Sequence, residues 1–472
     1  MDEALPADAL LVELRTRLGD AVSVDPAVLE QARADRSGHR SGAAPLALVE
    51  ARSIDDVQET MRFASRHRIP VVPRGAGTGL AGGAIGSGGE LVLSLARMDR
   101  ILEVSVEDEL AVVEPGVVNG DLDRALEATG LWFAPDPASR AISTIGGNIA
   151  TNAGGLLCVK YGVTREAVLG LRAVLADGSL LETGRRTVKG VTGLDLTALL
   201  VGSEGTLAVI VEATVRLRRR PAGGVSTLVA GFADAPAAAD AASRIMAAGA
   251  RPAVMELLDA PAVRAIAELF AARGEAGLLP SLGLGGEDAV LLVQADGRDA
   301  AAEIEAIRAV LEAGGASTRR TDDPAEGERL FTVRRAFHPA MERRGTVLIE
   351  DVSVPRSRLG EMLARVEEIG RRHGIAIPTV AHAGDGNLHP NLVVPHGMSS
   401  GSEEVPSAIW AAADELFRAC LELGGTLTGE HGVGILKRRW LEEELGASQL
   451  ALQRRVKAAF DPLGILNPGK AI

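Results

Sequence analysis

Strand-like and helix-like segments alternate along most of this chain, and this alternation limits the folds it can adopt. From Pro45 onward, a strand pattern at 46–51 precedes a helix pattern at 53–68, and another strand pattern follows at 69–75. Three further strand patterns, each followed by a helix pattern, begin at residue 226. Such alternation predicts a layered fold of the α/β or α+β class.

The 472 residues are too many for one hydrophobic core, so we expect several domains. The stretch PAGGV at 221–225 is typical of a linker, and PHGMSSGSEEVP at 395–406 of a polar loop. The later alternating set predicts split-βαβ packing, with helices on one face of an antiparallel sheet. We therefore expect a helical lead-in and three larger segments, with these boundaries: 1–44, 45–221, 222–425 and 426–472.

Charge and cysteine content exclude several classes of protein. A net charge of −13 argues against a broad nucleic-acid surface. The two cysteines cannot form a disulfide framework and fit a reducing cytoplasm. The acidic N-terminal segment is not typical of a signal peptide, and no apolar run reaches the ~18 residues of a membrane span. We expect a cytoplasmic, non-transmembrane protein, with peripheral attachment to a membrane left open.

Three stretches rich in glycine lie in the first half, and the first of them follows a strand pattern: PRGAGTGLAGGA at 73–84, STIGGNIATNAGG at 143–155 and GSEGTLAVI at 202–210. Glycine permits positive φ and a close approach of backbone N–H groups to an anion. The spacing matches neither the Rossmann fingerprint nor the Walker lysine motif. A single stretch of this kind is more often a flexible turn, but three together favour a nucleotide cofactor held by several loops.

Two short motifs carry candidate metal ligands. HAGDGNLHPN places His382 and His389 seven residues apart, which in a straight strand would put them on opposite faces. A bend at the intervening glycines would bring them together. TGEHGVG adds Glu430 and His431. Two histidines and a carboxylate are a ligand set for a catalytic divalent ion, provided that the two motifs converge. The other five histidines are expected at the surface or in packing.

These motifs carry a resemblance to a known family. PRGAGTGLAGG, PDPAS with TIGGNIATNAGG, and VGSEGTLAVI resemble the FAD-binding half of the vanillyl-alcohol-oxidase/p-cresol-methylhydroxylase (PCMH) superfamily. HAGDGNLHPN, TGEHGVG and the closing NPGK resemble its branch of D-2-hydroxy-acid (D-lactate) dehydrogenases and glycolate oxidase FAD subunits. The resemblance implies an α+β fold: a two-part PCMH-type FAD-binding domain over 45–221, a ferredoxin-like substrate or cap domain over 222–425, and a short helical return over 426–472.

The resemblance also implies which residues hold FAD. Residues 74–78 would surround the pyrophosphate, the second stretch would line the flavin and ribityl chain, and the third would lie near the adenine. Thr78 stands where some relatives carry a histidine linked to FAD, so the cofactor is expected to be non-covalent. The implied FAD contacts are Arg74, Gly75, Ala76, Gly77, Thr78, Gly79, Pro135, Ser143, Gly146, Gly147, Asn148, Thr151, Asn152, Gly202, Glu204, Gly205 and Ile210.

Within the resembling branch, the residues matching His382, His389 and Glu430 bind a divalent metal, which we expect to be zinc, with manganese or iron as alternatives. The resemblance also implies that His431 serves as the catalytic base. Arg334, in FTVRRAFHPA, matches an arginine that binds the substrate carboxylate; Arg335 is the fallback, and a plain surface arginine is the alternative. Asn391 is expected to contact the substrate or support the metal ligands.

The expected reaction is oxidation of a D-2-hydroxy acid to the 2-oxo acid, with hydride transfer to flavin N5. Ile349 and Glu350 stand where relatives that act on dicarboxylates tend to carry a lysine, which favours lactate, glycolate or another small acid. Alternatives are the FAD subunit of a multi-subunit glycolate oxidase, a flavin scaffold without chemistry and a zinc hydrolase. The electron acceptor is expected to be an electron-transfer flavoprotein, a cytochrome, a quinone or an iron–sulfur subunit, and a homodimer is left open.

Overall fold

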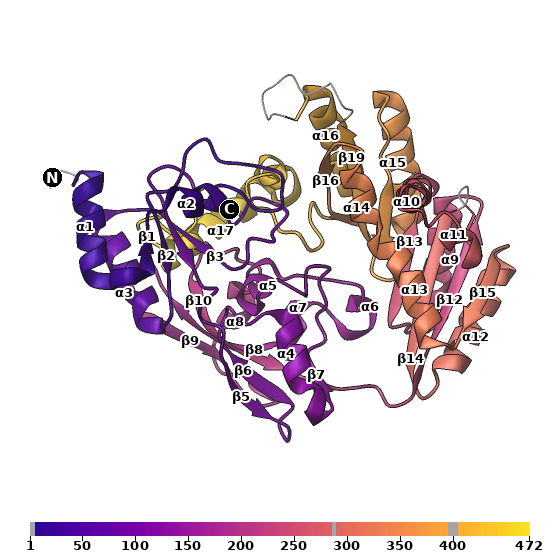
Figure 1. Ribbon diagram of the computed structural model, residues 1–472, viewed down its shortest axis with the longest axis horizontal. Helices are drawn as coiled ribbons and strands as arrows, with labels where there is room; N and C mark the ends of the chain where they lie inside the picture. The colour runs from indigo at the N-terminus through magenta and orange to yellow at the C-terminus, as the bar shows by residue number, and fades with distance from the viewer. Residues whose placement is uncertain (1–4, 286–288, 395–404) are drawn as a thin grey trace. The chain divides into compact units, whose positions relative to one another are not determined.

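The computed structural model describes residues 5–285, 289–394 and 405–472, which form two compact units (Figure 1). The first unit contains the chain up to Gly155, Gly162–Arg220 and Glu430–Ile472. The second contains Leu156–Tyr161 and Pro221–Gly429. The linker expected at 221–225 is shorter than predicted, because Gly224 and its successor already pair in a strand with β14. Most of the predicted polar loop at 395–406 lies outside the described residues.

A four-stranded sheet in the first unit has the order β1-β2-β4-β3. Helix α3 (Ile54–His67) is an example of how a predicted element forms. Ser53 caps its first turn by accepting from the Asp56 backbone N–H, and Val57 and Met61 are fully buried. The other elements are α1 (Ala7–Leu18), β1 (Val22–Ser23), α2 (Pro26–Ala32), β2 (Ala47–Glu50), β3 (Val71–Arg74) and β4 (Leu91–Ser94). The N-terminal lead-in contains two helices, α1 and α2, and strand β1, which pairs with β2, whereas residues 33–44 form turns and loop.

The second sheet of the first unit is antiparallel, in the order β5-β6-β10-β8-β9. Its central strand β10 (Val209–Arg216) serves two apolar cores, since Val209 packs with α3 whereas Ile210 packs with α5. The remaining elements are β5 (Ile101–Ser105), β6 (Leu110–Val113), α4 (Asn119–Leu126), β7 (Leu131–Trp132), α5 (Ile145–Thr151), α7 (Thr164–Ala167), β8 (Val168–Val174), β9 (Leu180–Gly184), α8 (Leu196–Leu200), β11 (Arg218–Arg219) and α17 (Leu441–Phe460).

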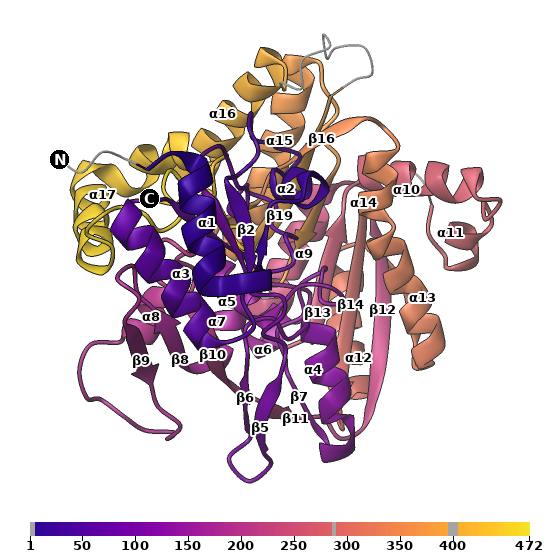
Figure 2. The ribbon, with the colours of Figure 1, turned by 60° about the vertical axis from the view of Figure 1, so that its left-hand side comes forward.

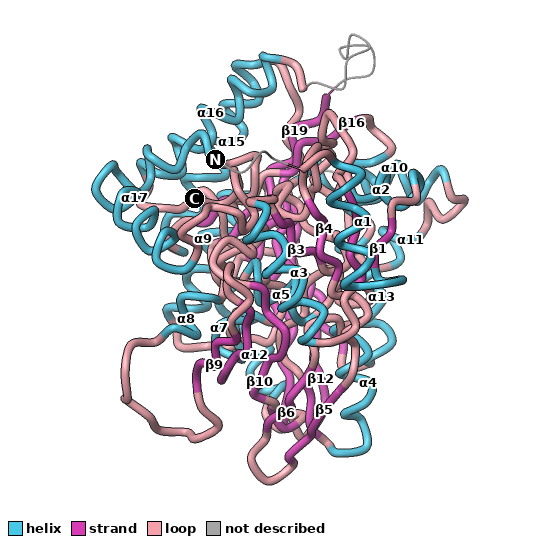
Figure 3. Tube along the Cα trace, turned by 90° about the vertical axis from the view of Figure 1, so that its left-hand side faces the viewer, coloured by secondary structure: helices cyan, strands magenta, loops and turns pink. Residues whose placement is uncertain are grey.

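A loop between β9 and α8 projects from the first unit in two views (Figures 2 and 3). It carries apolar side chains in full contact with solvent: Val188 is 100% exposed and Val191 98%. No described helix combines the length and apolar character needed to cross a membrane.

The second unit is built on an eight-stranded antiparallel sheet, ordered β15-β12-β14-β13-β18-β19-β16, with β17 paired to β19. Its strands are β12 (Gly224–Phe232), β13 (Val254–Leu258), β14 (Ala289–Gly297), β15 (Ser317–Thr321), β16 (Thr346–Ile349), β17 (Val352–Ser353), β18 (Thr379–His382) and β19 (Asn387–Val394). Its helices are α6 (Cys158–Tyr161), α9 (Ala235–Ala247), α10 (Ala260–Ala272), α11 (Leu278–Ser281), α12 (Ala300–Ala313), α13 (Pro324–Arg335), α14 (Phe337–Glu342), α15 (Leu359–His373) and α16 (Ser407–Glu422).

Helices cover both faces of this sheet, so the prediction of helices on one face was wrong. Val290 and Leu292 of β14 pack with α10, α13 and α14, on what we call the first face. Leu291 and Val293 point to the opposite face and are also fully buried, where α9 and α12 pack against the same strands. The physical reason is that β14 is apolar on both sides, a pattern of strands buried between two helix layers.

Candidate functional site

The two histidines of HAGDGNLHPN lie on neighbouring strands of a β-hairpin. β18 ends at His382, a four-residue turn follows at 383–386, and β19 begins at Asn387. In this register His382 lies opposite Asn387, and His389 lies opposite Val380, so both imidazoles are on the first face of the sheet. Their ring centroids are 5.2 Å apart, and each histidine is only 7% exposed. The predicted bend is therefore a hairpin turn.

Gly386 makes this turn possible. Its φ is +90°, and a Cβ at this position would lie 2.2 Å from the Val354 carbonyl oxygen. An L side chain would meet both a strained backbone and a steric clash. The glycine thus sets the reversal that brings the two histidines together.

A carboxylate that the sequence reasoning missed lies beside His382. Glu256, on β13, is directly opposite His382 in the register and is fully buried. Its Oε1 is 2.6 Å from His382 Nδ1, and its Oε2 accepts from Arg334 Nε at 2.7 Å. The available signal was a single ionisable residue inside the apolar run AVMELL.

Arg334 and Arg335 were both considered for substrate binding, and the structure separates them. Arg334 lies in the last turn of α13 with its side chain 14% exposed and its Nε on Glu256. Arg335 pairs instead with Glu328 on the exposed surface of the same helix, with its side chain 50% exposed. Of the two, only Arg334 belongs to the buried polar cluster.

A second missed carboxylate, Asp351, lies near His389. It is fully buried, accepts a hydrogen bond from Thr428 Oγ1 at 2.6 Å, and lies 3.9 Å from His389 Nδ1. Asn391, a predicted substrate contact, is 1% exposed and donates from Nδ2 to the His389 carbonyl at 2.8 Å. In this structure its amide stabilises the backbone of the histidine strand.

The structure brings two of the predicted metal ligands, His382 and His389, together within the second unit. Glu430 directly follows Gly429, the last residue of the second unit. Two imidazoles at this spacing, completed by one carboxylate, would suit a divalent cation that keeps an open position.

The three glycine-rich stretches also converge, within the first unit. A Cβ on Gly75 would lie 2.5 Å from Thr144 Oγ1, so the first stretch packs tightly against the second. The backbone N–H groups of Gly202 and Glu204 donate to the carbonyls of Ile149 and Ala150, which joins the third stretch to α5. In the sequence, the only sign of this convergence was that three such stretches occur in the same half of the chain.

Side chains of the first stretch hold the loop itself. Arg74 donates to the carbonyls of Ala84 and Ala34 at 2.6 and 2.9 Å, and burial lowers the pKa of its guanidinium. Gly77 has a φ of +68°, and the other predicted FAD contacts of this stretch lie in the same turn: Gly75, Ala76, Thr78 and Gly79. The loop is therefore shaped before any ligand binds.

Two predicted FAD contacts of the second stretch have buried polar atoms that lack partners. Ser143 Oγ and Asn148 Nδ2 have no hydrogen-bond acceptor or donor among the described residues. Asn152 has a φ of 51° at the end of α5 and accepts from the Arg165 N–H. The other predicted contacts here are Gly146 and Gly147, near the start of α5; Thr151, whose hydroxyl bonds the Gly147 carbonyl; and Pro135, whose carbonyl accepts from Asn119.

The third stretch supplies a buried carboxylate, Glu204. Burial raises its pKa from 4.5 to about 7, and its oxygens accept from the N–H groups of Val433 and Gly434 at 2.7 and 2.8 Å. This carboxylate thus fastens the segment that directly follows His431. Of its predicted neighbours, Gly202 and Gly205 have positive φ, and Ile210 is buried in the apolar core around α5.

The closing NPGK motif supports the first and third stretches. Asn467 Nδ2 donates to the carbonyls of Gly83 and Glu204 at 3.0 and 2.7 Å. Lys470 Nζ donates to the Ile85 carbonyl at 2.6 Å, and burial lowers the pKa of this amine to about 8. The C-terminal residues are therefore part of the glycine-rich site.

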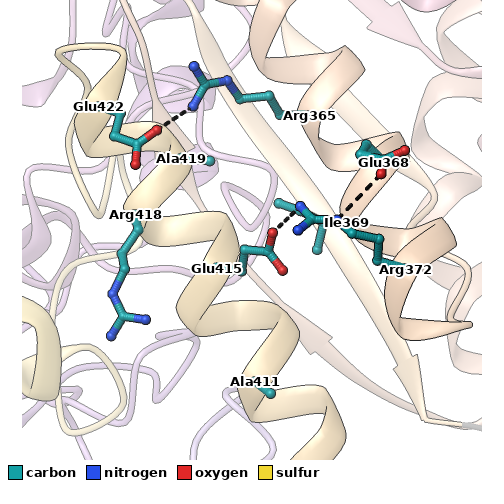
Figure 4. A pocket seen from close by; sticks show the side chains of 9 residues that line it. All are labelled: Arg365, Glu368, Ile369, Arg372, Ala411, Glu415, Arg418, Ala419 and Glu422. Atoms are coloured by element: carbon teal, nitrogen blue, oxygen red, sulfur yellow. Dashed lines mark hydrogen bonds and ion pairs between the residues drawn. The ribbon is translucent and has the colours of Figure 1, made fainter.

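A separate hollow of about 560 Å³ lies beside α15 and α16 in the second unit (Figure 4). Its walls are mostly charged and internally paired: Arg365 bonds Glu422 at 2.7 Å, and Arg372 pairs with Glu415. None of the predicted site residues lines it. We regard it as a salt-bridged surface between two helices.

Comparison with known proteins finds two family matches along the chain. Residues 45–184 match the family described as FAD binding domain, and residues 224–471 match FAD linked oxidases, C-terminal domain. Glycolate oxidase subunit GlcD of Bacillus subtilis is 42% identical over 430 residues, 90% of this chain and 88% of that relative. A D-lactate dehydrogenase of Archaeoglobus fulgidus is 35% identical over 432 residues, 90% of this chain and 91% of that relative.

Among solved structures, p-cresol methylhydroxylase with substrate bound has a TM-score of 0.78 at 18% identity, over 98% of this chain and 96% of that chain. This likeness shows a common fold. The chain belongs to the FAD-linked oxidases, and its curated relatives place it with the glycolate oxidase GlcD subunits and the D-lactate dehydrogenases of that family.

Proposed function

We propose that this FAD-linked oxidase uses a divalent metal ion to oxidise a D-2-hydroxy acid, D-lactate or a similar small acid, to its 2-oxo acid. The observation that carries the proposal is the pair of buried histidines His382 and His389, whose imidazoles lie on one face of the second unit's sheet with ring centroids 5.2 Å apart. Glu430, which directly follows the last residue of that unit, is the proposed third ligand. A flavin oxidase needs no metal for electron transfer alone. A Lewis acid is useful where a substrate must be gripped by a hydroxyl and lose its proton.

The predicted site residues fit both FAD and a divalent metal ion. The partnerless Ser143 Oγ and Asn148 Nδ2 and the closely packed glycine turn at Gly75 suit a polar cofactor with many acceptors. The imidazoles and the carboxylate suit zinc, with manganese or iron as alternatives. We propose that FAD is bound without a covalent link, since Thr78 offers no nucleophilic side chain comparable to histidine.

Each side chain then has a role. Bound FAD would supply the hydride acceptor, and the ion, held by His382, His389 and Glu430, would lower the pKa of the substrate hydroxyl. His431 would accept the hydroxyl proton, for which an imidazole is suited near neutral pH. Arg334 would pair with the substrate carboxylate. Asn391 would keep the strand of His389 in place, as its bond to the His389 carbonyl indicates.

The chain offers no lysine between residues 345 and 355, the segment where dicarboxylate-specific relatives tend to carry one. Ile349 lies opposite Asn391 in the sheet register, and Glu350 is 3% exposed. An apolar residue and an acid would disfavour a second substrate carboxylate. This supports a small monocarboxylic substrate.

The second candidate is the FAD subunit of a multi-subunit glycolate oxidase. It is favoured by the 42% identity with a protein of that name. The chain has only two cysteines, so any iron–sulfur centre would belong to another subunit. An electron-transfer flavoprotein, a cytochrome or a quinone would serve equally as acceptor for a protein working alone.

Dye reduction by the purified protein tests the proposal. We expect turnover with D-lactate and little with L-lactate, D-malate or D-2-hydroxyglutarate. Faster turnover with glycolate would favour the second candidate. Preference for the L-isomer, or full activity after the metal has been removed, would contradict the proposed function.

A further inference from the structure

A buried chain of three side chains, Arg334, Glu256 and His382, connects α13 to the histidine hairpin, all within the second unit. We propose that Glu256 is a positioning residue that fixes the orientation and tautomer of His382, and that Arg334 is its counter-charge. The inference rests on the proposed function in one respect: it treats His382 as a metal ligand.

The sheet register makes the contact specific. Glu256 and His382 are directly opposite each other on neighbouring strands, so their side chains leave the same face at the same level. Glu256 Oε1 lies 2.6 Å from His382 Nδ1. A carboxylate can only accept a hydrogen bond, so Nδ1 must carry the proton. Nε2 of the neutral ring then keeps its lone pair, which a metal requires.

The surroundings explain the need for Arg334. Glu256 is fully buried, and its other neighbour across the sheet is the apolar Leu292. A carboxylate in such surroundings is costly unless a cation and hydrogen bonds compensate for its lost hydration. Arg334 Nε supplies both at 2.7 Å from Oε2.

Arg334 can serve two carboxylates at once. Its Nε is used by Glu256, and within the described residues no hydrogen bond is found for its Nη1 and Nη2. A guanidinium with two parallel N–H groups left over can grip a second carboxylate in a bidentate way. The orientation of the metal ligand and the proposed substrate grip therefore depend on the same buried ion pair.

The carboxylate beside His389 lies farther away, since Asp351 Oδ1 is 3.9 Å from its Nδ1. The two histidines thus differ: at His382 the carboxylate is within a short hydrogen bond of Nδ1, and at His389 it is not. Removing Glu256 is expected to affect His382 selectively.

The experiment uses Glu256→Met, the double variant Glu256→Met/Arg334→Met, and a matched control, Glu415→Met. Glu415 also lies between an arginine and a histidine, with its Oε2 2.9 Å from His373 Nε2, but on the surface away from the site. The double variant replaces the buried ion pair by two apolar side chains, so the fold can be kept if the single variant is unstable.

Two readouts are measured on purified protein: the affinity for Zn²⁺ by competition with a coloured chelator, and the His382 tautomer by nitrogen-15 NMR of labelled histidines in the metal-free protein. We expect the double variant to lose roughly 10- to 100-fold in Zn²⁺ affinity, the range seen when the partner of a metal-binding histidine is removed. The Nδ1–H form of His382 should dominate in the wild type and in Glu415→Met, and be lost in the double variant.

Wild-type Zn²⁺ affinity in a folded double variant, or an Nε2–H tautomer in the wild type, would overturn the inference. The NMR readout needs no metal. If the wild type binds no Zn²⁺ but shows the Nδ1–H form, the metal proposal fails while the positioning role of Glu256 stands.

Discussion

Single buried carboxylates organise much of the second unit. Asp259 caps α10 by accepting from the Ala262 N–H at 2.7 Å, and it also accepts from the Thr379 N–H, at the start of β18, at 2.8 Å. Burial is the largest cause of a pKa raised from 3.8 to about 7, against which these two hydrogen bonds act. One side chain thus ties a helix cap to the first strand of the histidine hairpin.

The pKa of Asp259 predicts how stability depends on pH. The folded chain binds this proton more tightly than the unfolded chain, so the stability that it contributes is full below pH 3.8 and is lost as the pH rises to about 7. The loss is about 4 kcal/mol for a shift of about three pKa units. Thermal unfolding between pH 4 and pH 8 should therefore show a decline for the wild type that is smaller for Asp259→Asn. Parallel curves for the two proteins would contradict the assignment.

Gly386 gives a second prediction at the same scale. Its φ is +90°, and the Val354 carbonyl oxygen lies 2.2 Å from where a Cβ would stand, so Gly386→Ala should lower the free energy of unfolding by about 3 kcal/mol and weaken Zn²⁺ binding. Gly374→Ala is the matched control, because Gly374 has a φ of +66° at the end of α15 but nothing within 4 Å of its Cβ position. It should cost only about 1 kcal/mol and leave Zn²⁺ affinity unchanged. Equal effects in denaturant titrations would refute the steric account.

Among the elements, those with a cap and a clear period could be predicted from sequence. α3, α9 and α10 each begin after a Ser or Asp whose side chain accepts a backbone hydrogen bond, and the predicted patterns locate them well. Two-residue strands such as β1 and β17 could not be predicted, because they are defined only by their partners. The helix layers on both sheet faces were missed although β14 begins with the continuous apolar run AVLLV, which is typical of a strand buried on both faces.

The residues of the candidate site also divide into those that could be predicted from the sequence and those that could not. His382, His389 and the glycine stretches stand out because their residue types are unusual at those places in the sequence. Glu256 and Asp351 are ordinary acids in the sequence. Glu256 gains its partner His382 only through the sheet register, and Asp351 is bonded by Thr428, which is distant in the sequence. Long-range contacts of this kind leave no local pattern.

The C-terminal segment leads to a prediction at the element scale. Lys470 holds the Ile85 carbonyl and the Asn467 side chain, so Lys470→Met should loosen the glycine-rich loop after β3. We expect a faster release of FAD, by about 10-fold for the loss of ~1–2 kcal/mol in hydrogen bonding. Flavin fluorescence during dilution measures the release. Lys189→Met, at an exposed lysine of the β9–α8 loop, is the control, and an equal rate in both variants would argue against a role for the C-terminal segment.

Across the whole molecule, the glycine-rich stretches and the histidine hairpin belong to different units, although Glu430, the proposed third metal ligand, is the first residue of a segment of the first unit. The three glycine-rich stretches lie in the first unit, and the histidine hairpin with Glu256 and Asp351 lies in the second. Each unit builds its part from its own sheet and core, so we expect FAD binding and metal binding to be separable by mutation. A protein that has lost its metal should still be yellow.

Reduction of the bound flavin in the absence of oxygen tests the central claim most directly. D-lactate is mixed with metal-loaded wild type and with His389→Ala, and the flavin absorption band is followed. We predict rapid bleaching of the wild type, and bleaching at least ~100-fold slower in the FAD-loaded variant, since a Lewis-acid ion contributes several kcal/mol to such a step. L-lactate should leave both proteins oxidised. Equally fast bleaching of the two proteins by D-lactate would show that the histidine hairpin takes no part in the chemistry.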